Sequence, residues 1–418
     1  MRMDSYGKAA FLSLLLLAPQ FAMPQRNVWV ATWTASPTAG DADPSEPLLN
    51  IEDQTVRERV RVSVGGSQIR LRLSNEYGSS PLLLGFVTVA MPNGPAGVQS
   101  ASIRSVTFNK GTSVTIPAGA PILSDPIPFS AAQGAEISIS LYFPKRVSTV
   151  TWHSLALKRA VVSTRGDHTR DETIEGGTDS ESSIAITGVF VPAQPSQHLI
   201  VAFGDSIVDG DQSTVDADRN WPSDLIRRLE SAGAGSQSAV VNEGIAGNRL
   251  LSEGPLAILG VSALARFDRD VLSQPGVTHI VLFEGLNDIC FPGAKLGDVS
   301  LASPADVRSA EDVIRAYQQL IARAHTHDIK VIGATINPFE GVSISGYYSD
   351  AKEATRQAVN RWIRNSGEFD GVIDFDRVLR DPDHPSRLLS RFASPDHLHP
   401  NDAGYQAMAN AIDLSLFR

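Results

Sequence analysis

The chain has 418 residues, of which 42% are hydrophobic and 20% are charged, and its formal net charge is −10. This length exceeds what one hydrophobic core usually supports, and the composition is that of a globular protein, so we expect two domains. The negative charge argues against a general nucleic-acid binder and against a protein that binds anionic membranes, whereas a neutral substrate agrees with it.

The first residues have the pattern of an export signal. Arg2 and Lys8 precede a ten-residue apolar stretch, 9–18, which is too short to span a bilayer. We therefore predict a signal peptide over residues 1–23 and a secreted protein, extracellular or periplasmic. The alternative is an N-terminal tail or a helix of the fold. No later segment reaches spanning length, so we expect no stable membrane insertion.

The sequence contains a single cysteine, Cys290. One cysteine cannot form an internal disulfide, so the protein must depend on its hydrophobic core. A nucleophilic role for Cys290 is conceivable from its place shortly after Asp288. A lone cysteine usually behaves as a small buried hydrophobe, and that is the role we expect.

From residue 28 to residue 191 the sequence reads as β-strands. Polar and apolar residues alternate over 57–64 and 68–73, and both runs end in residues that favour turns. Further alternating runs cover 103–108, 135–143 and 148–157. No strong amphipathic helix interrupts them. We predict an all-β accessory domain, a β-sandwich or jelly roll, over 28–191.

A short proline-containing segment, 192–197, leads into a different pattern. Apolar strands are expected at 199–203, 239–241, 279–283, 329–334 and 372–375, and helices at 221–232, 313–324, through 362–363 and from 402 toward 416. Strands that are buried on both faces and joined by helices predict a doubly wound parallel sheet. We place this α/β domain at residues 197–418.

Short polar signatures follow three predicted strands of this sheet, at the edge where open α/β sheets place their chemistry. The first, Gly204-Asp205-Ser206, comes directly after the strand at 199–203. Its serine can therefore act as a nucleophile at that edge. The alternative is a turn in which Ser206 or Asp205 caps the next helix.

A serine hydroxyl needs a base, and the segment Asp396-His397-Leu398-His399 offers one. The spacing of three residues lets Asp396 bind one ring nitrogen of His399 while the other nitrogen faces the serine. His397 is then a loop residue with a secondary packing role. The two histidines could instead form a metal pair, but no third ligand lies nearby in the sequence.

The tetrahedral intermediate of ester cleavage carries negative charge on oxygen, and fixed N–H donors stabilise it. We expect these donors to be the side chain of Asn287 and the backbone N–H groups of Gly247 and Ser206. Gly247 follows the strand at 239–241, and Asn287 follows the strand at 279–283. The simpler interpretations are a tight turn for Gly247 and a cap or Asx-turn for Asn287.

These signatures resemble those of the SGNH (GDSL-type) hydrolases over about residues 197–418. The four residues that name the family and its acidic residue match Ser206, Gly247, Asn287, His399 and Asp396. The resemblance implies a flavodoxin-like three-layer α/β/α fold with a parallel sheet. It also implies a serine esterase that needs no cofactor and no metal.

Stretches 31–36, 60–63 and 70–75 also resemble a bacterial and fungal branch of the family that carries a β-rich domain before the hydrolase domain. Some members of that branch look like esterases of acetylated plant polysaccharides such as xylan. One departure from the expected pattern is Glu284, where we would expect an uncharged residue. We interpret it as a group at the active-site rim or as a buried partner of an arginine.

Together these features predict a secreted serine carboxylic ester hydrolase that removes short acyl groups, acetyl above all, from carbohydrate. Its partner would be a small-molecule or polysaccharide ester and not a nucleic acid. The alternatives are a short-chain lipid or aryl esterase, a carbohydrate-binding protein with weak or no activity, and an acyltransferase. The sequence has no Gly-x-Ser-x-Gly run, which argues against an α/β-hydrolase nucleophile elbow.

Four residues of the N-terminal region have two interpretations each. Trp29, Trp33 and Trp152 could bind sugars, although core packing is the interpretation we favour. His153 could border the active site across the domain interface or be a satisfied core histidine.

Overall fold

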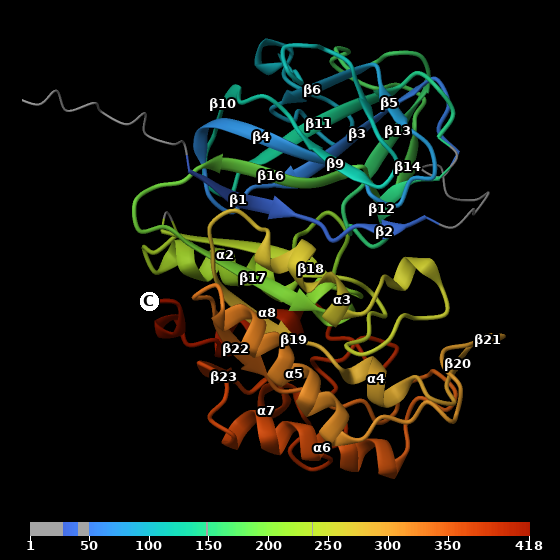
Figure 1. Ribbon diagram of the computed structural model, residues 1–418, viewed down its shortest axis with the longest axis vertical. Coiled ribbons are helices and arrows are strands. Elements are labelled where there is room, and N and C mark those ends of the chain that lie inside the picture. Colours follow the sequence, from blue (N-terminus) through green and yellow to red (C-terminus); the bar gives the residue numbers. More distant parts are fainter. Residues whose placement is uncertain (1–27, 41–49, 148, 236) are drawn as a thin grey trace, which may run out of the picture.

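The computed structural model describes residues 28–40, 50–147, 149–235 and 237–418. The predicted signal peptide over residues 1–23 lies outside the described residues. Figure 1 shows a β-rich half above an α/β half, in chain order. The last strand of the upper half ends at Pro192, and the first strand of the lower half begins at His198.

The β-rich half is built mainly from two antiparallel sheets. The first contains β1 (Trp29–Thr34), β4 (Gly66–Asn75), β9 (Ala120–Leu123), β10 (Ile127–Ala131) and β16 (Ile186–Pro192). The second contains β3 (Gln54–Arg61), β6 (Phe86–Ala90), β7 (Arg104–Ser105), β11 (Glu136–Phe143), β13 (Ala160–Arg165) and β14 (Thr178–Ser180). Smaller pairings join β2 (Thr38–Ala39), β12 (Thr151–His153) and β15 (Ser183–Ile184), and β5 (Leu82–Leu84) with β8 (Val114–Ile116).

The alternation of polar and apolar side chains along the strands explains why the two sheets pack against each other. Ile69, Leu71 and Leu73 of β4 are fully buried, as are Ile137 and Ile139 of β11, because every second side chain of a strand points to the same face. Both sheets contribute these residues to one hydrophobic core. The predicted β-rich half is therefore present, while its jelly-roll topology stays a prediction.

Two of the expected strands are much shorter than predicted. In the run 103–108 only Arg104–Ser105 forms a strand, because the Thr107 carbonyl accepts a hydrogen bond from the Asp125 N–H and Phe108 pairs with Gly111, so neither residue continues the ladder with β6. Val106 and Phe108 are nevertheless buried, so the alternation reflected burial without a full ladder of hydrogen bonds. In the described part of the run 148–157, residues 149–157, only β12 forms.

The α/β half contains a parallel sheet in the order β18-β17-β19-β22-β23. Its strands are β17 (His198–Gly204), β18 (Ser238–Gly244), β19 (Val277–Phe283), β22 (Lys330–Ala334) and β23 (Gly371–Ile373). The first strand in sequence has the second and third strands on either side, which is the order of flavodoxin-like sheets. Ligands of such sheets bind at the carboxyl ends of the strands where the order reverses, here at β17.

Helices connect the strands, as predicted. They are α1 (Ser206–Asp209), α2 (Trp221–Ser231), α3 (Ala263–Phe267), α4 (Leu286–Cys290), α5 (Ala310–His325), α6 (Asp350–Asn365), α7 (Phe375–Leu379) and α8 (Asp402–Ala411). A two-stranded hairpin, β20 (Lys295–Leu296) and β21 (Val299–Ser300), projects between α4 and α5. Helix α2 packs against α8, and α5 packs against α6. The α/β class of this half is confirmed.

Two predicted elements of this half are too long. The strand predicted at 372–375 ends at Ile373, because the Asp374 side chain accepts a hydrogen bond from the Arg377 N–H and caps α7. The last helix ends at Ala411 and not near Leu416, and a separate 3₁₀ turn covers Leu414–Phe417.

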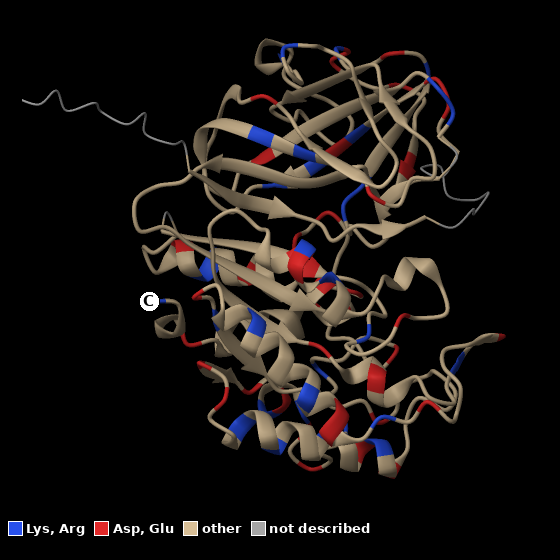
Figure 2. Ribbon diagram, in the orientation of Figure 1, with Lys and Arg blue, Asp and Glu red and all other residues tan. Residues whose placement is uncertain are grey.

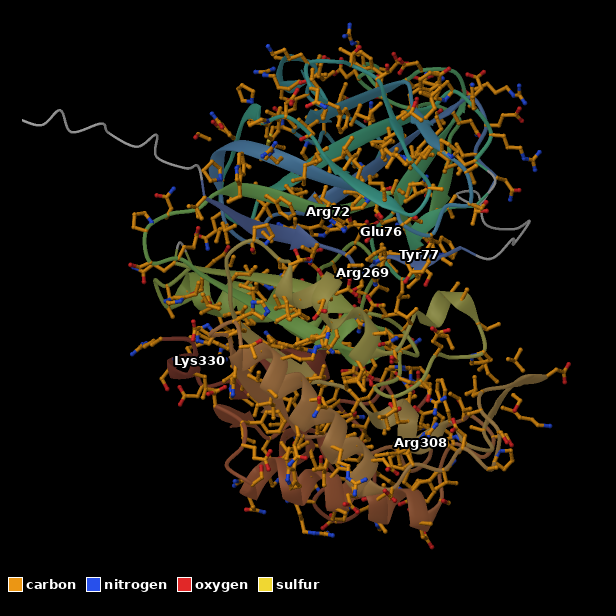
Figure 3. The ribbon with its side chains drawn as sticks, viewed as in Figure 1. Arg72, Glu76, Tyr77, Arg269, Arg308 and Lys330 are labelled. Atoms are coloured by element: carbon orange, nitrogen blue, oxygen red, sulfur yellow. The ribbon has the colours of Figure 1, made fainter. Side chains whose placement is uncertain are left out.

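Polar contacts join the two halves. Arg59 lies 2.8 Å from Asp216, and Lys158 lies 2.8 Å from Asp218. Arg269 donates a 2.8 Å hydrogen bond to the hydroxyl of Tyr77, and Figure 3 labels this pair where the halves meet. The β-rich half is thus bound to the α/β half through oriented polar groups.

Figure 2 shows acidic and basic residues intermixed along the described ribbon. None of the helices in the described parts of the chain is both long and apolar enough to cross a membrane.

Candidate active site

Ser206 lies just beyond the carboxyl end of strand β17. The strand ends at Gly204, where a Cβ atom would lie 1.8 Å from the carbonyl oxygen of Phe283, so the close approach of β19 requires glycine. Asp205 then caps α1, because its Oδ1 accepts a 3.0 Å hydrogen bond from the Ile207 N–H. The capping role therefore belongs to Asp205, and the Ser206 hydroxyl is available for another partner.

That partner is His399. The Oγ of Ser206 lies 2.8 Å from Nε2 of His399, and the Nδ1 of the same ring lies 2.6 Å from Oδ2 of Asp396. The other oxygen of Asp396 accepts hydrogen bonds from the Ser394 hydroxyl and from the N–H groups of Leu398 and His399, at 2.6, 2.8 and 3.0 Å. The loop thus fixes the carboxylate, the carboxylate fixes the ring, and the ring faces the serine.

Charges around the ring set its protonation. Burial lowers the pKa of His399, but the hydrogen bond with Asp396 and the negative charges of Asp211, Asp396 and Asp205 outweigh burial and raise it above its ordinary value. Burial would raise the pKa of Asp396, but its hydrogen bonds with His399 and Ser394 hold it well below its usual range. Asp396 is therefore a carboxylate at neutral pH.

Asp211 is a second carboxylate beside the ring. Its Oδ2 lies 3.6 Å from Nε2 of His399, the nitrogen that contacts Ser206. The Asp211 carbonyl accepts a 2.7 Å hydrogen bond from the hydroxyl of Tyr405, which is fully buried in α8. The negative charge of Asp211 is thereby held next to the serine–histidine contact.

The turn after β18 brings Gly247 to the neighbouring strand end. Gly247 adopts φ of 72°, a conformation that favours glycine. The next residue, Asn248, anchors the turn, because its side chain donates to the carbonyls of Leu259 and Val261 and accepts a hydrogen bond from Arg266. Among the described residues, no group accepts a hydrogen bond from the backbone N–H of Gly247 or of Ser206.

Asn287 lies in the first turn of α4, after β19 on the other side of β17. Its Nδ2 donates a 2.8 Å hydrogen bond to the carbonyl of Asn248, and its Oδ1 accepts a 2.7 Å hydrogen bond from Tyr347. Because Tyr347 fixes the oxygen of the amide, the NH₂ group points to the Asn248 turn and keeps a second N–H for another acceptor. The structure therefore brings Ser206, Gly247 and Asn287 to three adjacent strand ends.

The remaining predicted residues lie outside this arrangement. His397 is exposed, with φ of 60°, and is a loop residue as expected. Among the described residues, no group of three or more histidine, cysteine and acidic side chains could hold a metal ion. Cys290 is fully buried, and burial raises the pKa of its thiol well above the ordinary value. Its environment is therefore that of the small buried hydrophobe that we expect.

Glu284 is buried close to an arginine and is not a rim group. Its side chain is fully buried, with Oε2 at 3.9 Å from Nη2 of Arg266. Burial and the nearby Asp205 raise the pKa of Glu284 well above its ordinary value. Of the tryptophans, Trp152 is buried, and Trp29 and Trp33 pack against the hydrophobic core, which agrees with the core interpretation.

Three residues of the site were not predicted. Asp211 lies five residues after Ser206 in a polar run, and the sequence carries no sign that it faces His399. Tyr347 lies in an irregular segment before α6, and Arg266 lies in a short helix with no periodic pattern. Each acts through a contact with a residue distant in sequence, so only the spatial arrangement identifies it.

Comparison with known proteins identifies the family of the α/β half. The model of the GDSL-like lipase/acylhydrolase family matches residues 200–412, which is half of the chain. The chain belongs to this family. It is therefore an esterase of the GDSL type, and the hydroxyl, imidazole and carboxylate described above lie within the matched segment.

Several solved structures are similar to this acylhydrolase over about half of its chain. A GDSL-like lipase from Bacteroides thetaiotaomicron is 16% identical, with a TM-score of 0.38 over 54% of this chain and 91% of its own. A carbohydrate acetylesterase family member from Sinorhizobium meliloti is 16% identical, with a TM-score of 0.39 over 51% of this chain and 95% of its own. A mutant of Axe2, an acetyl-xylooligosaccharide esterase from Geobacillus, is 18% identical, with a TM-score of 0.39 over 52% of this chain and 92% of its own. No curated protein sequence matches the chain.

Proposed function

We propose that this acylhydrolase is a secreted serine esterase that removes acetyl groups from carbohydrate, with Ser206, His399 and Asp396 as its catalytic triad. The observation that carries the proposed chemistry is the 2.8 Å contact between Ser206 Oγ and His399 Nε2, with Asp396 on the other ring nitrogen. A base in direct contact with the hydroxyl and oriented by a third group is the general requirement for an activated serine.

The first half of the reaction forms an acyl-enzyme. His399 takes the proton of Ser206 as Oγ attacks the ester carbonyl carbon, and the carbonyl oxygen becomes an oxyanion. The N–H groups of Ser206 and Gly247 and the second amide N–H of Asn287 bind that oxyanion. The C–O bond to the alcohol then breaks, and His399 gives its proton to the leaving alcohol.

The second half returns the enzyme to its starting state. His399 takes a proton from water, the resulting hydroxide oxygen attacks the acyl carbon, and the bond to Ser206 Oγ breaks as the proton returns to Ser206. The product is the free acid, which ionises in solution.

A shallow, open groove beside the turn of Gly247 supports a carbohydrate as the alcohol part. The groove has a volume of about 590 Å³, and its lining combines polar residues, such as Glu253, Ser303 and Asp306, with apolar ones, such as Pro255 and Leu301. Such polar side chains bind hydroxyl groups through hydrogen bonds.

The groove lies close to the proposed oxyanion site. Gly254 on its wall and Gly247 both face Leu259, since Cβ atoms built on them would lie 2.5 and 2.6 Å from its methyl groups. One side chain therefore separates the groove from Gly247. Export of the chain, which the apolar stretch 9–18 predicts, would bring this site to extracellular polymers.

The test is release of acetate from acetylated xylan and from other acetylated glycans, measured beside hydrolysis of p-nitrophenyl acetate and octanoate. The proposal predicts acetate release from a glycan and faster turnover of the acetate ester than of the octanoate. A strong preference for octanoate with no release from any glycan would favour the lipid esterase instead. Transfer of acetyl to an added alcohol without free acetate would indicate an acyltransferase.

A further inference from the structure

A histidine of the β-rich half contacts the segment that carries the nucleophile. Nε2 of His153, in β12, lies 3.0 Å from Oδ1 of Asp209, and Nδ1 lies 2.9 Å from the carbonyl oxygen of Ser36. Asp209 is the last residue of α1, the single turn that begins with Ser206. Both side chains are buried, with 10% and 4% of their surfaces exposed.

The second oxygen of Asp209 binds the proposed oxyanion turn. Oδ2 accepts a 3.0 Å hydrogen bond from the N–H of Ala246, which directly precedes Gly247. The chain approaches closely here, since a Cβ atom on Gly244 would lie 2.2 Å from the nitrogen of Asp209. Asp209 therefore connects the nucleophile turn with the turn of Gly247, and His153 fixes its position from the other half.

A second connection runs from the same part of the β-rich half. The hydroxyl of Ser36 donates a 2.5 Å hydrogen bond to Glu243 and accepts one of 3.1 Å from Arg266. Arg266 in turn donates to the carbonyl of Gly204, at 2.7 Å, and to the side chain of Asn248, at 2.9 Å. Gly204, shortly before Ser206, and Asn248, directly after Gly247, are thus both linked to Ser36 through Arg266.

We propose that His153 is a positioning residue for ester hydrolysis: by binding Asp209 it fixes the turn that presents the Gly247 N–H, so the β-rich half completes the oxyanion-binding site. A small displacement of an oxyanion donor has a large effect, because a misplacement of about 1 Å can cost about a hundredfold in rate. The inference rests on the proposed roles of Ser206 and Gly247.

Electrostatics agree with the geometry. Burial lowers the pKa of His153, but the charge and hydrogen bond of Asp209, the Ser36 carbonyl and the charge of Glu243 outweigh it and raise the pKa to about 9. The Ser36 carbonyl can only accept a hydrogen bond, so Nδ1 of His153 donates to it, and Nε2 faces the carboxyl group of Asp209.

The test compares His153→Ala, His153→Gln and a control, His168→Gln, with p-nitrophenyl acetate. His168 also belongs to the β-rich half and pairs with an aspartate, Asp171, at 2.7 Å, but this pair is partly exposed and has no contact with α1. We expect His153→Ala to lower kcat by about ten- to a hundredfold at unchanged KM, and to slow phosphonylation of Ser206 by a p-nitrophenyl phosphonate equally. His153→Gln, which keeps one N–H donor, should recover most of the rate, and the control should match the wild type.

A folded His153→Ala protein with wild-type kcat and phosphonylation rate would overturn the inference. If His153→Ala does not fold, a cycle of His153→Leu, which keeps the volume but has no donor, with Asp209→Asn and the double variant decides, because residues that act through one contact are non-additive in kcat. Full additivity would overturn the inference. A Ser206→Ala protein that retains activity would instead overturn the proposed function, so the two failures are distinguishable.

Discussion

Asp211 lies 3.6 Å from the nitrogen of His399 that contacts Ser206, on the opposite side of the ring from Asp396. The proton that His399 takes from Ser206 is therefore bound next to a second negative charge. This charge raises the pKa of His399, together with Asp396 and Asp205. A base with a raised pKa accepts protons more strongly but remains protonated, and therefore inactive, to a higher pH.

The pH profile tests this relationship. His399 acts as a base only when it is neutral, so kcat/KM should rise with pH through an inflection above the ordinary histidine value. Asp211→Asn removes a charge that favours the protonated ring, so its inflection should move to lower pH. Asp179→Asn, an exposed residue of β14, serves as the control. An inflection that stays in place or moves to higher pH in Asp211→Asn would contradict the role of Asp211.

Asn287→Ala should reduce kcat by about a hundred- to a thousandfold, with little change in KM, because it removes a donor that acts in the transition state. The steady-state kinetics of p-nitrophenyl acetate hydrolysis measure this. Asn365→Ala, at the end of α6, removes an exposed amide that binds only the carbonyl of Arg361 and should leave kcat unchanged. Equal kinetics of the two variants would exclude Asn287 from the oxyanion site.

Gly247→Ala should lose both stability and activity. An alanine at φ of 72° is strained by roughly 1–2 kcal/mol, and its Cβ atom would lie 2.6 Å from Leu259. Gly233→Ala is the matched control, because Gly233 has φ of 74° and no neighbour within 4 Å of such a Cβ atom. Thermal unfolding should show losses for both variants, whereas kcat should fall, by about tenfold or more, only for Gly247→Ala. Unchanged kcat in a folded Gly247→Ala protein would count against the proposed donor.

Iodoacetamide should leave the native enzyme active. The Cys290 side chain is fully buried, and burial raises the pKa of its thiol, so the reactive thiolate is neither formed nor accessible. Residual p-nitrophenyl acetate hydrolysis after incubation with the reagent measures this, and the unfolded protein is the control for labelling. Loss of activity in step with labelling of Cys290 in the folded protein would show that the thiol contributes to catalysis.

The sequence predicts those parts of the fold that local patterns determine. The apolar face of α5 follows from residues such as Val313, Tyr317 and Leu320, and the helix begins at Ser309 in a capping box with Asp312. The strands β17 and β19 are continuous apolar runs because helices cover both faces of the sheet. Local patterns fail where backbone groups of an alternating run bond to residues outside the sheet, as those of Thr107 and Phe108 do.

The same distinction between local patterns and long-range contacts applies to the active site. Asp396 and His399 are three residues apart, so their hydrogen bond could be predicted from spacing. The contact of His399 with Ser206 spans 193 residues and could be expected only from the topology of the sheet. The contact of His153 with Asp209 could not be predicted, because no local pattern relates β12 to α1 across two differently folded halves.

The most direct test of the account is to identify the residue that becomes acylated. The enzyme is treated with a p-nitrophenyl phosphonate, which forms a stable analogue of the tetrahedral intermediate on the nucleophile, and the modified peptide is found by mass spectrometry. We expect one adduct per chain, on Ser206, together with complete loss of esterase activity, and no adduct in the Ser206→Ala protein. An adduct on another residue, or full activity in Ser206→Ala, would contradict it.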